Sequence, residues 1–134
     1  MLKFFHDYKK QKERRQEMKA LVLETKANLE AYYVMFQLGR LRYFTLDVLK
    51  KAQTSSEFSD HAIVEYARRL TEYNRLVKDY KDFEFWYNED LERKNKDNGR
   101  ILHQKKELAQ EQFTGLEAVI KAAIAHFEQE GTRR

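Results

Sequence analysis

The chain of 134 residues contains no cysteine and no proline, and it has only four glycines. The lack of cysteine excludes disulfide frameworks, cysteine-ligated zinc and thiolate catalysis. Because glycine and proline are the residues that most often interrupt helices, their scarcity favours long helices. Charged residues make up 36% of the chain and apolar residues 42%, a balance typical of a solvated helical domain. We therefore expect one all-α domain over residues 1–134.

Motifs of enzymes and metalloproteins are also missing. The sequence has no glycine-rich phosphate loop and no nucleophile elbow. Its four histidines lie far apart and outside the Glu-x-x-His and His-Glu-x-x-His spacings of helical metal sites. A metal site assembled across helices stays open as an alternative, although surface or partly buried histidines are the preferred interpretation. We predict a non-enzymatic protein with no catalytic residues, no metal and no cofactor.

No segment has the composition expected of a membrane span or a signal peptide. The most apolar window, residues 32–49, carries Arg40, Arg42 and Asp47, which a spanning helix would bury at a cost of several kcal/mol. The first residues lack an apolar run of the length that signal peptides have. We expect a soluble, cytoplasmic protein.

Basic charge is concentrated at the N-terminal end. Residues 1–19 hold seven Lys or Arg and three acidic residues, whereas the rest of the chain holds 19 of each. This segment predicts a charged partner, which would be nucleic-acid phosphates, an anionic membrane surface or an acidic protein. A solvated helix face is the remaining alternative. The candidate phosphate-binding residues are Lys9, Lys10, Lys12, Arg14, Arg15 and Lys19.

Tyrosine recurs every seven residues at positions 66, 73, 80 and 87. Ile63, Leu70, Val77, Glu84 and Leu91 interleave with it at the spacing of a coiled-coil seam, so this stretch predicts a long helix. The tyrosines could form a stacking platform for single-stranded nucleic acid. Because they share their seam with aliphatic residues, a place in the core is favoured. For Glu84, acid–base chemistry is less favoured than a structural role, in which the side chain reaches the edge of the core, hydrogen-bonds a tyrosine hydroxyl or fixes the helix register.

The apolar pattern predicts an antiparallel bundle of three long helices. The first helix has a basic extension over 1–19 and a body over 20–53, the second spans 60–96 and the third 101–128. The extension either continues the first helix or folds back as a short fourth helix, because the second helix is too short to cover it.

Finer features follow from the same pattern. Ser59 is the expected N-cap of the second helix, and Gly99 the expected reversal after it. Gly39 and Gly115 are expected at packing contacts, and Gly131 at the end of the third helix. If the second and third helices are antiparallel about residues 96–99, Tyr80 lies opposite 115 or 116 and Tyr73 opposite 122 or 123. If the first and second helices are antiparallel, Arg42 lies near Glu72.

Two apolar stretches exceed what a three-helix bundle would cover. Apolar residues surround the first helix between 32 and 49, and residues 83–87 place consecutive aromatic rings around the second. A partner is therefore expected, which is either the N-terminal segment folded back or another chain, such as a second copy. Its candidate interface comprises Tyr33, Met35, Leu38, Leu41, Phe44, Phe85 and Trp86. The sequence predicts a protein for protein–protein interaction or assembly; the alternative is a nucleic-acid-binding accessory protein that uses the basic N-terminal helix.

Overall fold

The structure is a computed structural model that describes the backbone of residues 2–55 and 58–132, and the side chains of 7–54 and 58–132. All its regular elements in these ranges are helices, as predicted. Five are α-helices and η1 is a short 3-10 helix: α1 (Leu2–Leu38), α2 (Asp47–Ser55), α3 (His61–Glu89), η1 (Leu91–Arg93), α4 (Lys96–Phe113) and α5 (Leu116–Thr132).

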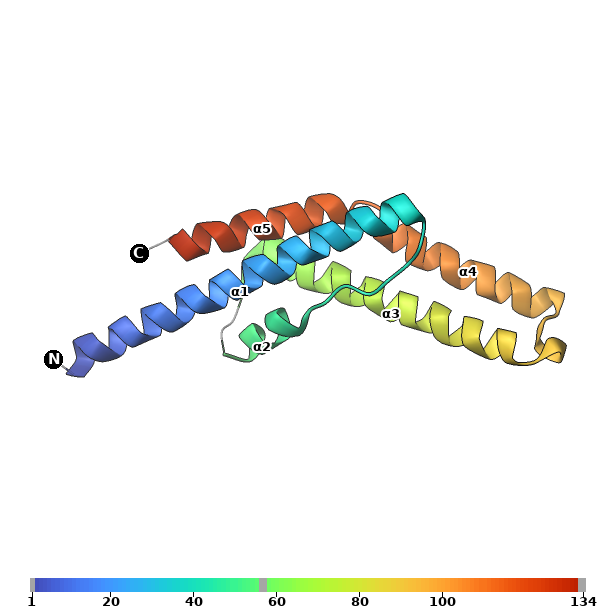
Figure 1. Cartoon of the computed structure of the whole chain (residues 1–134), viewed down its shortest axis with the longest axis horizontal. Helices are drawn as coiled ribbons and strands as arrows, with labels where there is room; N and C mark the ends of the chain where they lie inside the picture. Colours follow the sequence, from blue (N-terminus) through green and yellow to red (C-terminus); the bar gives the residue numbers. More distant parts are fainter. Residues whose placement is uncertain (1, 56–57, 133–134) are drawn as a thin grey trace.

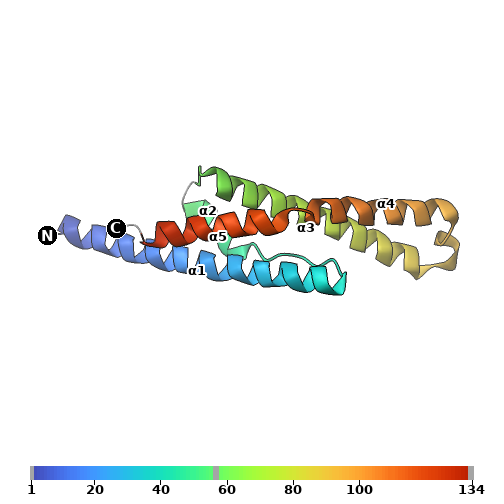
Figure 2. The same cartoon turned by 90° about the horizontal axis from the view of Figure 1, so that it is seen from above.

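The direction of α1 relative to α3 differs from the prediction. Asn28 of α1 contacts Tyr66 of α3. Two turns further along both helices, Met35 contacts Tyr73, so α1 and α3 run in the same direction. The chain makes this arrangement by returning through an extended segment and α2 before α3 begins (Figure 1). α5 packs antiparallel to α1, and α4 packs antiparallel to α3 (Figure 2). The prediction that the first two long helices are antiparallel is wrong.

The first helix ends at Leu38 and not near residue 53. Gly39 has φ +66°, and its N–H donates to the carbonyl oxygen of Met35 at 2.8 Å. A left-handed residue that closes the last turn in this way is a common C-terminal cap, and glycine adopts it without steric cost. Gly39 therefore terminates α1 and is not the packing contact that the sequence predicted.

Two asparagines hold the extended segment that follows. Asn74 of α3 accepts from the N–H of Phe44 at 2.8 Å and donates to its carbonyl at 2.9 Å. Asn28 of α1 does the same for Thr45, at 3.0 and 2.8 Å. Because neighbouring residues of an extended chain face opposite ways, one asparagine binds from each side. The segment is thus fixed between α1 and α3 with its backbone groups satisfied.

Glu24 caps the N-terminal end of α2. Its two carboxylate oxygens accept from the N–H groups of Val48 and Leu49, at 2.8 and 3.1 Å. The first N–H groups of a helix have no partner inside the helix, and a carboxylate also suits the positive end of the helix dipole. The returning chain then buries four of its own apolar side chains: Phe44, Leu46, Leu49 and Ala52. The apolar residues from Phe44 onward are therefore covered from within the chain, whereas several between 33 and 43 stay exposed.

The tyrosine seam forms the core, but only over the first half of α3. Tyr66 and Tyr73 are fully buried, together with Ile63, Leu70 and Val77. They pack against α1 and α5, whose fully buried side chains include Leu21, Leu116, Ile120 and Phe127. Tyr80 and Tyr87 are only half-buried, and Leu91 is 84% exposed. The core interpretation is confirmed for the seam up to residue 77.

The predicted third helix is divided at Gly115, which has φ +82°. Arg69 of α3 donates to the carbonyl oxygens of Gln112 and Thr114, at 3.3 and 3.0 Å, and so satisfies the free end of α4. Gly115 is therefore a helix break and not a packing contact. Gly131 lies inside α5, which continues to Thr132.

The helix boundaries around α3 and the register with α4 also differ from the prediction. Asp60, not Ser59, caps α3 by accepting from Ala62 N–H. α3 ends before η1, and Gly99 lies inside α4, whose N-cap is Asn95. The reversal comes earlier than predicted, so Asp79 pairs with Lys105 and the Tyr73 ring contacts Phe113. The predicted pairings of Tyr73 and Tyr80 with α5 are therefore wrong. Arg42 is likewise not paired with Glu72, which binds Arg75.

Candidate functional site

Beyond residue 77 the α3 helix leaves the buried core of the protein. We call residues 78–108, which comprise the second half of α3, η1 and most of α4, the arm; the remaining helices form the bundle. The arm projects past the end of α1 (Figure 1). None of its residues is buried, and its most exposed large apolar residues include Phe85 at 69% and Leu91 at 84%. Trp86, Ile101 and Leu108 are also exposed.

Polar and aromatic contacts hold the two helices of the arm together. Lys105 of α4 binds Asp79 of α3 at 2.7 Å, and its ammonium lies 5.5 Å from the centre of the Phe83 ring. Phe83 in turn contacts Trp86, with ring centroids 5.3 Å apart. At Gly99 an added Cβ would lie 3.6 Å from the Tyr87 hydroxyl oxygen, so the backbone approaches the tyrosine closely there. The arm is thus a thin hairpin without a buried core.

The seam carboxylate Glu84 takes the structural role that the sequence favoured. The Tyr80 hydroxyl donates to Glu84 Oε2 at 2.7 Å. Partial burial and this carboxylate raise the pKa of Tyr80 to about 12. The hydroxyl therefore stays protonated at neutral pH and keeps its hydrogen bond.

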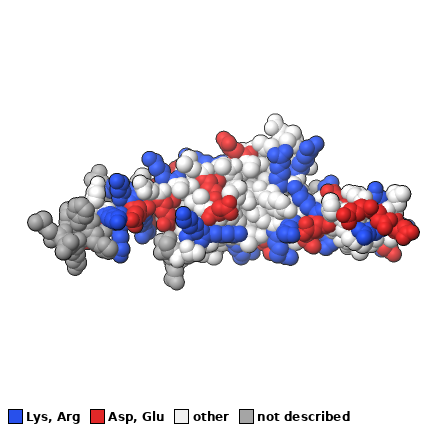
Figure 3. All heavy atoms as spheres, turned by 60° about the horizontal axis from the view of Figure 1, so that its bottom comes forward, with Lys and Arg blue, Asp and Glu red and all other residues white. Residues whose placement is uncertain are grey.

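The tip of the arm, residues 82–92, is acidic and aromatic. It contains five acidic residues and no basic residue. Acidic side chains gather at this end of the molecule in Figure 3. The following residue, Arg93, folds back with its guanidinium 4.8 Å from the centre of the Trp86 ring and binds Glu89 at 3.2 Å. Phe85 and Leu91 stay exposed among the carboxylates.

The end of α1 is a second exposed apolar surface. Tyr32 stacks on Phe113 with ring centroids 4.5 Å apart, and Met35 is buried. The other apolar residues of these turns face outward: Tyr33, Val34, Phe36 and Leu38. Phe36 is 73% exposed. A patch of this kind on a helix end is typical of a surface that another chain covers.

The predicted interface residues divide between interior and surface. Met35 and Phe44 are 3% and 4% exposed, covered by the protein's own chain, and Leu41 is half-buried against the core. Four of the predicted residues are exposed: Tyr33, Leu38, Phe85 and Trp86. The structure places the first two at the end of α1 and the other two on the arm, so they form two surfaces and not one.

The predicted phosphate-binding residues are all exposed on α1, yet they do not form one patch. Arg14 binds Glu130 of α5 at 3.4 Å and borders a polar hollow of about 350 Å³ that also contains Asp60 and His126. Lys12, Arg15 and Lys19 border a different hollow. Lys9 and Lys10 line neither.

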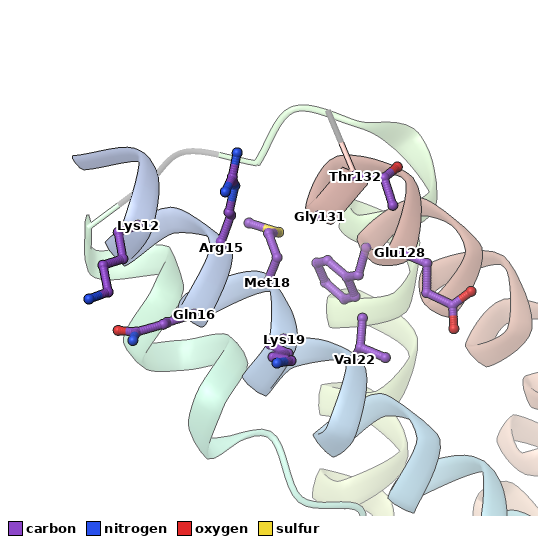
Figure 4. A pocket seen from close by; sticks show the side chains of 10 residues that line it. Lys12, Arg15, Gln16, Met18, Lys19, Val22, Glu128, Gly131 and Thr132 are labelled. Carbon is purple, nitrogen blue, oxygen red and sulfur yellow. The ribbon is translucent and has the colours of Figure 1, made fainter. Parts of the chain in front are cut away.

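The hollow beside Lys12, Arg15 and Lys19 is an open groove of about 540 Å³ between α1 and α5. We call it the basic groove. Met18 and Val22 point from α1 toward α5 in its floor, and Glu128 and Thr132 stand on the α5 side (Figure 4). Phe127 closes the floor. Because Glu128 already binds Lys26 at 2.9 Å, the three cations of α1 dominate the charge of the rim.

The sequence pattern did not predict several residues that define these surfaces. Nothing in the pattern linked Met18 and Val22 to Phe127, because the contact depends on the antiparallel packing of α1 and α5. The roles of Asn28, Asn74 and Glu24 were missed for the same reason. Their spacing carries no periodic signal.

In the part of the chain that the structure describes, two histidines each contact one carboxylate. His126 Nδ1 lies 3.4 Å from Asp60 Oδ2, and His103 binds Glu107 on the same helix at 2.8 Å. Among residues 7–54 and 58–132, no group of three or more His, Asp or Glu side chains is placed to hold a metal ion. Within the described helices, none is long and apolar enough to cross a membrane.

The chain matches no known protein family, no curated protein and no solved structure. Its function has to be inferred from its own surfaces.

Proposed function

We propose that this chain is a non-enzymatic helical protein that binds another protein chain, in the first place a second copy of itself. The observation that supports this proposal is the arm, which buries no side chain and exposes Phe85 and Trp86 near its end. A helical hairpin that contributes nothing to its own core gains apolar burial when a partner covers it. The exposed Phe36 and Leu38 at the end of α1 add a second surface of this kind.

The residue types support a protein partner. Exposed tryptophan, tyrosine and phenylalanine supply most of the binding energy of protein interfaces when a partner desolvates them. The arm and the end of α1 both offer aromatic rings flanked by charged residues, which gives an apolar centre with a polar rim.

Light scattering coupled to size exclusion, with sedimentation equilibrium, tests this proposal. We expect the full chain to self-associate, and Phe36→Asp or Trp86→Asp to weaken the association by about thirtyfold or more, as for interface hot spots. Tyr8→Asp is the matched control, because Tyr8 is a comparably exposed aromatic residue outside both surfaces. A strictly monomeric wild-type chain would contradict the proposal.

Nucleic-acid binding is the second candidate function. The exposure of all six predicted cations on the N-terminal half of α1 favours it. Binding to DNA or RNA would weaken steeply with salt, because each neutralised phosphate releases counterions. Fluorescence anisotropy with labelled single- and double-stranded oligonucleotides measures this, and Lys9→Glu, Lys10→Glu, Arg14→Glu and Arg15→Glu together should abolish it. The absence of binding at low salt would exclude this candidate.

A further inference from the structure

The two ends of the molecule carry complementary chemistry. At one end the basic groove combines Lys12, Arg15 and Lys19 with an apolar floor in which Val22 is half-buried and Met18 and Phe127 are almost fully covered. At the other end the tip of the arm, residues 82–92, combines five carboxylates with exposed aromatic and aliphatic side chains. Figures 1 and 3 place the tip and the N-terminal half of α1 at opposite ends of the long axis.

We propose that the basic groove receives the tip of the arm from a second copy of this chain. This inference rests on the proposed function and names the partner and the site. It accounts for charge and shape together, since the groove has cations around an apolar floor and the tip has acids around apolar side chains.

The spacing of the exposed residues on the tip fits such a groove. Asp82, Phe85, Trp86 and Glu89 are exposed on α3 at positions i, i+3, i+4 and i+7. This pattern places them on one face of the helix, as in helices that dock into grooves. Leu91 extends the same apolar group past the end of α3.

Contact within one molecule is excluded by distance. α3 has 29 residues, and each residue of its second half places the tip roughly 1.5 Å further from the bundle. The arm is a straight hairpin, so its tip cannot return to the groove of its own chain (Figure 2). The groove must therefore receive the tip of another molecule.

The free cations of the rim determine the polarity of the contact. In the described part of the chain, Arg14 binds Glu130, whereas Arg15 and Lys19 point into solvent beside the groove (Figure 4). Carboxylates of the incoming tip, such as Glu92, would pair with them at the rim. Rim pairs of this kind mainly set specificity and the rate of association, while the desolvated aromatic rings supply affinity.

A mixing experiment with two variants tests the proposal. The groove variant carries Arg15→Glu and Lys19→Glu, and the tip variant carries Phe85→Ala, Trp86→Ala and Leu91→Ala. All five positions are exposed, so both variants should keep the fold. We expect each variant alone to self-associate at least roughly tenfold more weakly than the wild type.

Mixed in equal amounts, the two variants should form a one-to-one complex of two chains. The groove variant still has an intact tip, and the tip variant still has an intact groove, so one contact per pair is restored. Sedimentation equilibrium gives the mass. Because Trp86 is the only tryptophan in the chain, emission from the groove variant reports when its tip leaves water.

Lys9→Glu with Lys10→Glu is the matched control, because it makes the same charge change on the same helix outside the groove. This variant should associate as the wild type does. If the groove variant associates normally while Phe36→Asp does not, the chain self-associates through the end of α1: the proposed function then stands and the groove assignment is wrong. If the wild type is monomeric, both are wrong.

Discussion

The bundle and the arm are built from the same helix, α3, yet they are stabilised in different ways. Up to Val77 every seam residue of α3 is buried without water contact, because α1 and α5 cover it. From Lys78 to Glu89 the seam continues, but the helices that pack against it are α4 and η1, and none of these α3 residues is buried. A heptad repeat therefore determines which face of a helix is apolar, whereas the number of neighbouring helices determines whether that face becomes a core.

The largest expected difference between the two regions concerns aromatic side chains. Phe127→Ala in the bundle should reduce the free energy of unfolding by about 3–5 kcal/mol, because Phe127 is fully buried. Phe85→Ala in the arm should change it by less than about 0.5 kcal/mol, since Phe85 is 69% exposed. Urea unfolding followed by circular dichroism measures both. Equal losses at the two positions would contradict the distinction between core and arm.

Next in size is the loss of the asparagine that holds the extended segment. Asn28→Ala should cost about 1–3 kcal/mol, because it removes the partner of the part-buried backbone groups of Thr45 and the buried contact with Tyr66. Asn88→Ala is the control, since Asn88 is exposed on the arm. Thermal unfolding compares the two variants. If Asn28→Ala were as mild as its control, the segment would not depend on these bonds.

A pH dependence of stability is expected from tyrosines in both regions. Burial raises the pKa of Tyr73 in the bundle, and burial with the Glu84 contact raises that of Tyr80 in the arm to about 12, from an ordinary value of 10.0. The unfolded chain therefore loses these protons first as pH rises, so stability is full below pH 10 and falls above it. Tyr73→Phe and Tyr80→Phe should each remove a similar share of this loss at pH 11, because both hydroxyls stay largely protonated in the folded chain at that pH.

Urea unfolding at pH 8 and at pH 11 measures the loss for the wild type and for each variant. A wild-type chain equally stable at both pH values would show that the tyrosines are not protected by folding.

The smallest expected effect is on the ion pair that joins the helices of the arm. Lys105→Met removes the contact with Asp79 and should cost less than about 1 kcal/mol, since the pair is partly exposed. Hydrogen exchange of the arm amides should nevertheless accelerate, because the arm opens locally without unfolding the bundle. Lys106→Met is the control, and a change confined to bundle amides would contradict this view.

Much of the fold could be read from spacing alone. The heptad from Ile63 to Val77 identified the inner face of α3, because side chains one helical turn apart share a face whatever packs against them. A structural role was favoured for Glu84, and the hydrogen bond from the Tyr80 hydroxyl is one of the alternatives expected for it, since both residues lie on the same helix one turn apart. Local patterns of this kind survive in any tertiary arrangement.

The errors came where a helix could end or continue with equal local propensity. Residues 39–46 have a helical apolar pattern, but Gly39 adopts a left-handed conformation and the segment that follows is held by Asn28 and Asn74. Those partners lie on α1 and on α3. No local pattern predicts a hydrogen bond between a side chain and a backbone group that lie 17 or 30 residues apart in the sequence.

The exposure of the predicted interface residues follows from where the chain returns over itself, and their binding to a partner stays a prediction. Met35 and Phe44 were expected outside because a straight helix cannot bury all of its faces, yet the returning chain covers both. Phe85 and Trp86 were expected outside by the same argument and are exposed, because no segment returns over the arm.

The sequence by itself therefore determined the helical class, the apolar faces and the location of the basic charge, since these depend on residues within a few turns of each other. Only the tertiary structure decided that α1 and α3 run parallel, that the apolar stretch after Leu38 folds inward, and that the basic groove and acidic tip lie at opposite ends. These features depend on contacts between distant segments, whose free energy exists only when the whole chain is assembled.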